Sequence, residues 1–151
     1  MPTKSDLEDQ LHQAMRQGDD LRRRTLRMAL SAVKLAEVER KGELDESDIT
    51  KILQREAKSR EETIADAKKA GRDDLVAASQ AELELLRTYL PEQLSDPELE
   101  GLVKQAIAET GASEPSDMGQ VMGQLMPQVG ARADGKRVSK IVQRMLSEQE
   151  S

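Results

Sequence analysis

The sequence predicts an all-α protein, with an N-terminal four-helix unit that contains an antiparallel helical hairpin and a small C-terminal three-helix domain. Apolar residues recur with a helical period along nearly the whole chain, and no segment alternates as a half-buried strand does. Several periodic segments end just before a glycine, as helices do when the following residue adopts positive φ. These glycines are Gly18, Gly42, Gly71 and Gly111.

Four helices are predicted ahead of residue 92. The first begins at Ser5, whose side chain can cap the first turn with Glu8 as its capping-box partner, and it ends near Gly18. Pro91 stops the last, because proline cannot continue a helix and restricts the residue before it. The other three helices cover about 20–41, 48–70 and 73–90.

The third and fourth helices predict a buried polar pair. Gly71 joins them too tightly for anything but an antiparallel hairpin, so residues equidistant from it face each other. Arg60 and Glu82 are such a pair, and both lie on the apolar stripes of their helices, with Glu56 one turn before Arg60. Because a lone buried charge costs ~3–5 kcal/mol, we interpret these residues as a structural ion-pair network that fixes helix register. The alternative is a charged groove for a polar ligand.

The segment Pro91–Pro97 reads as a hinge between two domains. We place an N-terminal helical domain at 1–92 and a C-terminal three-helix domain at 95–151. Ser95 is predicted to cap the first helix of the second domain, with Glu98 as its capping-box partner.

Two further short helices are predicted in the C-terminal domain, over 118–126 and 138–146, from apolar residues at i, i+3, i+4, i+7 and i+8. Gly119 and Gly123 form a G-x-x-x-G on the first of them, which predicts that another helix backbone approaches closely there. Three methionines line one side of the same helix, and we interpret them as core residues; they are Met118, Met122 and Met126.

The amino-acid composition excludes most classes of catalytic site. The chain of 151 residues has no Cys, Trp or Phe, and its single histidine, His12, lies off the apolar stripe of its helix. Thiolate chemistry and sites built on several imidazoles are therefore excluded, and only carboxylate sites for hard metal ions stay possible. No nucleophile, base and orienting group can be assembled. We predict no catalytic residues, no cofactor and no metal site.

Charge and hydropathy describe a mildly acidic chain. Lys and Arg number 23 against 29 Asp and Glu, for a net charge of −6. No apolar run is long enough to span a bilayer, and the first residues lack an apolar signal region. We therefore expect a cytoplasmic protein with no membrane partner.

Basic residues gather near the C-terminus. Residues 130–144 hold five of them against Asp134 alone, a local net charge of +4. They are Arg132, Lys136, Arg137, Lys140 and Arg144. Either they form a solvated helix face, or they contact the phosphates of structured RNA without aromatic stacking. Four or five phosphate contacts imply a log–log salt slope of about −4 to −5 by analogy with duplex binding. Arg22–Arg24 with Arg27 could extend this surface.

Several strings, in this order and spacing, resemble the GatB/YqeY family over nearly the whole chain. They are Gln54-Arg55-Glu56, Ala70-Gly71-Arg72-Asp73-Asp74-Leu75, Glu82-Leu83-Glu84, Tyr89-Leu90-Pro91-Glu92-Gln93-Leu94-Ser95, Asp117-Met118-Gly119-Gln120-Val121-Met122-Gly123-Gln124-Leu125-Met126-Pro127 and Ala133-Asp134-Gly135. The most specific are the Tyr-Leu-Pro-Glu-Gln-Leu and Asp-Met-Gly…Leu-Met-Pro strings.

The resemblance implies a two-part helical fold and links the chain to the C-terminal region of the GatB subunit of glutamine-dependent aminoacyl-tRNA amidotransferase, a carbon–nitrogen ligase. In that family the helical tail engages tRNA, while other domains and subunits perform the chemistry. This chain matches only the tail. The resemblance therefore implies a non-catalytic partner of tRNA, or of the tRNA charging or amidation machinery, with no particular tRNA or oligomeric state indicated. The alternative is a protein–protein adaptor that does not bind RNA.

Overall fold

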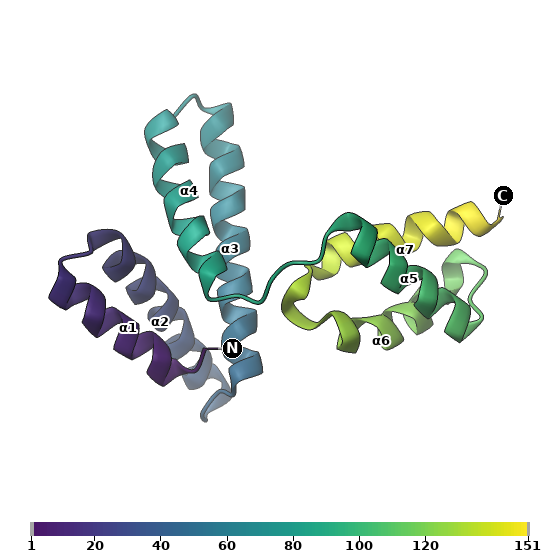
Figure 1. The fold of residues 1–151 in the computed structure, drawn as a ribbon, viewed down its shortest axis with the longest axis horizontal. Coiled ribbons are helices and arrows are strands. Elements are labelled where there is room, and N and C mark those ends of the chain that lie inside the picture. Colours follow the sequence, from purple (N-terminus) through teal and green to yellow (C-terminus); the bar gives the residue numbers. More distant parts are fainter. Residues whose placement is uncertain (1, 151) are drawn as a thin grey trace. The chain divides into compact units, whose positions relative to one another are not determined.

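The computed structural model describes residues 2–150, which form seven α-helices and two short 3-10 turns, with no strand among them (Figure 1). The all-α prediction is confirmed. The α-helices are α1 (Lys4–Gln17), α2 (Asp20–Arg40), α3 (Glu46–Lys69), α4 (Asp73–Thr88), α5 (Asp96–Thr110), α6 (Met118–Val129) and α7 (Gly135–Glu150). The 3-10 turns are Pro115–Asp117 and Gly130–Arg132.

The chain divides into two compact units, Met1–Pro91 and Glu92–Ser151. In the first, α1 packs on α2, α3 packs on α4, and α2 contacts both α3 and α4. Its fully buried side chains include Leu7, Leu26 and Val33. Each such side chain contributes about 1.5–3 kcal/mol of apolar burial. The core of the first unit therefore comes from all four of its helices.

The first helix begins earlier than predicted. Thr3, not Ser5, is its N-cap: the Thr3 hydroxyl accepts a hydrogen bond from the Asp6 amide at 3.1 Å, and the Asp6 carboxylate accepts one from the Thr3 amide at 2.9 Å. The latter bond lowers the pKa of Asp6. The earlier start adds the hydrogen bond from the Leu7 amide to the Thr3 carbonyl at 3.1 Å. Both pairs fit the capping-box pattern, so the sequence alone does not separate them.

Two other helix ends also differ from the sequence prediction. Gly42 does not end α2; Lys41 adopts the left-handed conformation instead, with φ of 59°, and its amide bonds the carbonyls of Glu37 and Val38. The left-handed cap thus lies one residue before the glycine, although a non-glycine residue is disfavoured in that conformation. α3 begins at Glu46 rather than after Ser47, because Asp45 caps it.

A charged network joins three helices inside the first unit. Arg60 of α3 donates from Nη1 to Oε2 of Glu82 on α4 at 3.1 Å, and Glu82 is only 8% exposed. Glu56 lies one turn away, with its Oε2 4.0 Å from Arg60 Nη2. The structure adds a member that the sequence did not indicate, because Arg24 of α2 donates from Nε to the other oxygen of Glu82 at 3.2 Å. Both Glu82 oxygens are therefore occupied, and the carboxylate links α2, α3 and α4.

The second unit forms a separate core from α5, α6 and α7. Ser95 caps α5 with Glu98 in a capping box, as predicted. The Leu94 amide donates to the Arg132 carbonyl at 2.8 Å, and Gln93 Nε2 donates to the Ala131 carbonyl at 3.0 Å. Much of the segment predicted as a hinge is therefore bonded to the second unit.

The two glycines of α6 do not have the predicted role. Gly119 and Gly123 are exposed, and nothing lies within 4 Å of the point where a Cβ would stand on either. Among the described residues, no helix approaches them. Instead, α6 buries Val121 and Leu125 in the core of the second unit. Its methionine side is partly buried against the same core, as predicted, through Met118, Met122 and Met126.

We predict that Arg60→Ala lowers the free energy of unfolding by about 2–3 kcal/mol, because it leaves the buried Glu82 carboxylate with Arg24 alone. Arg87→Ala is the matched control. It breaks an ion pair with Glu61 between the same two helices at the same 3.1 Å, but both side chains are 54% exposed, so we expect a loss below about 1 kcal/mol. Urea denaturation followed by circular dichroism measures both. Equal losses would contradict a buried network.

Candidate nucleic-acid interface

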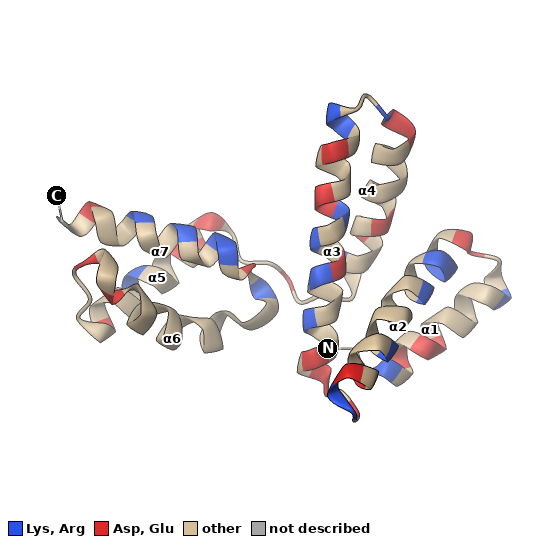
Figure 2. Ribbon diagram, turned by 180° about the vertical axis from the view of Figure 1, so that it is seen from behind, with Lys and Arg blue, Asp and Glu red and all other residues tan. Residues whose placement is uncertain are grey.

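The amphipathic helix α7 positions the predicted basic residues. Val138, Val142 and Leu146 are fully buried in the core of the second unit. Figure 2 shows lysine and arginine at intervals along the same helix. Four-residue steps place Lys136, Lys140 and Arg144 in one exposed row, about 6 Å apart along the helix axis.

Two carboxylates of α5 neutralise the arginines of α7. Asp96 Oδ1 accepts from Arg137 Nη2 at 2.5 Å and from Nε at 3.1 Å. Glu100 Oε1 accepts from Arg144 Nη2 at 2.7 Å, and Glu148 lies 3.7 Å from Arg144 Nε. The hydrogen bond to Glu100 raises the pKa of Arg144 above its ordinary value. An incoming anion must therefore compete with these carboxylates.

Arg132 has a structural partner. Its Nη2 donates to the carbonyl of Gln128 at 2.6 Å, and its Nε donates to that of Val129 at 3.4 Å. These carbonyls lie at the C-terminus of α6, where carbonyls lack partners within the helix and where a cation is favoured by the helix dipole. Arg132 thus stabilises the end of α6, a role the sequence did not reveal because it depends on where α6 ends.

The two lysines differ from the arginines. Lys136 and Lys140 are exposed, and neither forms an ion pair with any carboxylate among the described residues. The surrounding unit is acidic overall, with six Lys and Arg against ten Asp and Glu over residues 92–151. The positive surface is therefore small, and two lysines form its freely available part.

The second basic cluster lies in the first unit and is mostly occupied. Arg22 bonds the side-chain oxygens of Gln10 and Gln17, and Arg23 pairs with Asp20. Those three partners and Glu82, which holds Arg24, are all residues of the same unit. Arg27 alone of this cluster is exposed without such a partner within the described part of the chain.

Residues suited to metal binding do not gather in the described part of the chain. Within residues 2–150 no three His, Asp or Glu side chains are grouped so that they could hold a metal ion. His12 is exposed on α1. The described helices include none that is long and apolar enough to cross a membrane.

Comparison with known protein families gives a match over nearly the whole chain. The family model described as "Yqey-like protein" matches residues 4–146. This range includes α1 to α6 and most of α7.

Curated relatives share the name "Altered inheritance of mitochondria protein 41, mitochondrial". The protein from Lachancea thermotolerans is 31% identical over 115 residues, which cover 74% of this chain and 62% of that protein. The protein from Vanderwaltozyma polyspora is 36% identical over 56% of this chain and 46% of its own length. The protein from Pyrenophora tritici-repentis is 30% identical over 93% of this chain and 78% of its own length. The match thus spans less than two thirds of the first two relatives.

We predict that Arg132→Ala destabilises the second unit by about 1 kcal/mol, because two carbonyls at the end of α6 lose a charged donor. Lys140→Ala, which removes a side chain without an ion-pair partner in the described structure, should change stability by less than about 0.5 kcal/mol. Hydrogen exchange of the α6 amides in the two full-length variants separates these outcomes. Equal protection in both would show that Arg132 is not a structural residue.

Proposed function

Because the chain belongs to the Yqey-like protein family, we propose that it is a helical module that binds structured RNA, tRNA foremost, and catalyses no reaction itself. The observation that supports this proposal is the exposed row of Lys136, Lys140 and Arg144 on α7. The resemblance to the C-terminal region of GatB points to tRNA as the RNA. Association with the machinery that charges or amidates tRNA belongs to the same proposal.

The contact would be made to phosphates and not to bases. Double-stranded RNA is recognised mostly by its shape and backbone, which suits a row of long cationic side chains. Tyr89 is the only aromatic residue of the chain, and it is half-buried against the core of the first unit. Stacking on unpaired bases, the usual means of reading single strands, therefore contributes nothing at α7.

The α5 carboxylates determine how many cationic side chains of α7 are available to contact RNA phosphates. Lys136 and Lys140 can meet phosphates directly, whereas Arg137 and Arg144 must first leave Asp96 and Glu100. Exposed ion pairs contribute only about 0–1 kcal/mol, so phosphates can displace them at a modest cost. Two direct contacts imply a log–log salt slope of about −2, shallower than five free cations would give.

We predict that Lys136→Gln/Lys140→Gln abolishes most of the tRNA affinity at low salt and flattens the salt slope by about 2, since two phosphate contacts are lost. The matched control is Lys68→Gln/Lys69→Gln, the same charge change on two exposed lysines of α3. Fluorescence anisotropy with labelled bulk tRNA over a salt titration measures both. No binding by the wild type, or equal losses in the two variants, would refute the RNA function.

A second variant tests the competing carboxylates. Asp96→Asn/Glu100→Gln should tighten tRNA binding several-fold and steepen the slope toward about −4, because Arg137 and Arg144 become available. Glu92→Gln/Glu109→Gln makes the same change in net charge at exposed sites that pair with no Lys or Arg in the described structure, and should have a smaller effect. An unchanged slope in the first variant would show that the arginines take no part.

A further inference from the structure

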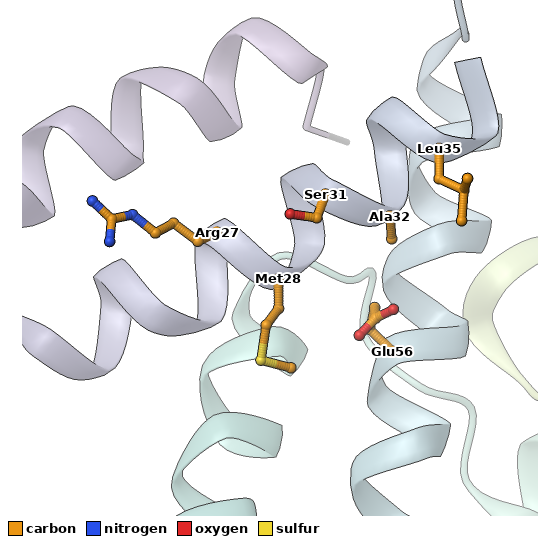
Figure 3. Close-up of a pocket in the computed structure, with 6 residues that line it drawn as sticks. All are labelled: Arg27, Met28, Ser31, Ala32, Leu35 and Glu56. Carbon is orange, nitrogen blue, oxygen red and sulfur yellow. The ribbon is translucent and has the colours of Figure 1, made fainter. Parts of the chain in front are cut away.

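The first unit has a groove beside α2 that the proposed RNA contact does not use. Its volume is about 420 Å³. Figure 3 shows that five of the lining side chains come from α2 and that Glu56 comes from α3, with Met28 directed into the space between the helices. The lining residues are Arg27, Met28, Ser31, Ala32, Leu35 and Glu56.

An apolar ridge borders this groove. Leu35 is 60% exposed, and Val38, one turn further along α2, is 73% exposed. α2 already buries Leu26, Leu30 and Val33 in the core of its own unit, so these two residues are not needed there. A helix with apolar residues on more than one face is typical of an element that is covered on more than one side. Among the described residues of the first unit, nothing covers this second face.

Two unpaired cations lie along α2 beside the ridge, and one of them, Arg27, also lines the groove. Arg27 and Lys34 are seven residues apart, which places them on one side of α2, and both are exposed. Neither forms an ion pair with a carboxylate among the described residues. Glu39 follows Lys34 by five residues and so lies about 140° round the helix from it. Glu56, across the groove, is already near Arg60 at 4.0 Å.

We propose that this α2 surface binds an amphipathic helix of a protein partner, with acidic residues along one edge of that helix. Apolar side chains spaced by one turn would enter the groove and cover Leu35 and Val38, as in other helix-in-groove complexes. The acidic edge would meet Arg27 and Lys34, whose charges have no counterpart within the described chain.

Other classes of ligand would match fewer of the three features of this surface, which are the two cations, the apolar ridge and the groove. RNA phosphates would match Arg27 and Lys34 but would leave Leu35 and Val38 in water. An anionic lipid surface would match both the charges and the ridge, but a flat surface seated on the ridge would not reach the half-buried Met28 and Ala32, which line the shallow groove beside it. A partner helix with an apolar face and an acidic edge satisfies all three. The inference does not rest on RNA binding, which concerns the other unit.

The test uses the full chain and two labelled, monomeric 18-residue amphipathic peptides as probes. Both have the same leucine face; one has glutamates along one edge of that face, and the other has lysines at the same positions. Fluorescence anisotropy at low salt should show the acidic peptide binding at least about tenfold more tightly. Adding salt should reduce that preference, because the contacts are exposed and therefore screened.

Three variants locate the site. Leu35→Asp should weaken the binding of the acidic peptide at least about tenfold. Because Leu35 is exposed, this variant should keep the fold, as measured by circular dichroism. Arg27→Glu/Lys34→Glu should reverse the preference in favour of the basic peptide. Lys51→Glu/Lys69→Glu, the same charge change on exposed residues of α3, should leave the preference as it is.

Several results would overturn the proposal. These are acidic-peptide binding weaker than about 1 mM, equal binding of both peptides, no effect of Leu35→Asp, or a preference that Arg27→Glu/Lys34→Glu does not change. Binding to anionic vesicles that Leu35→Asp abolishes, without peptide binding, would overturn it in favour of a lipid surface. Peptide results and tRNA results are independent, so either proposal can fail alone.

Discussion

The Glu82 carboxylate is the constraint on which the N-terminal unit depends. One buried acidic group accepts from Arg24 of α2 through one oxygen and from Arg60 of α3 through the other, so three helices share it. Apolar packing is non-directional and tolerates sliding, whereas this contact requires a particular register of α4 against both neighbours. The groove that contains Glu56 lies between α2 and α3, two of the three helices that this carboxylate joins.

How much of this network the sequence reveals depends on chain connectivity. Gly71 joins α3 to α4 directly, so the pairing of Arg60 with Glu82 follows from counting residues away from the turn. Arg24 is 58 residues from Glu82, and no local rule brings them together. The residues at which helices begin and end are harder to predict than the helices themselves, for a related reason. Competing caps such as Thr3 and Ser5 both fit the capping-box pattern, so the local sequence does not choose between them.

The basic surface shows the same limit. The period of apolar residues places Lys136, Lys140 and Arg144 on the outer face of α7, and the structure has them there. The period does not show that Asp96 and Glu100 of α5 lie within hydrogen-bond distance of two α7 arginines, because that contact joins residues more than 40 positions apart. A count of charges along the sequence therefore overstates the cations that a polyanion would meet.

The two proposed surfaces differ in chemical character. The free lysines of α7 provide positive charge, and no apolar side chain beside them is comparably exposed. Such a surface suits a phosphate backbone but distinguishes little between ligands of different shape. The α2 surface combines unpaired cations with Leu35 and Val38, so charge alone cannot satisfy it. Under the two proposals, the second unit would contact a phosphate backbone and the first a protein helix, so each unit would have its own class of ligand.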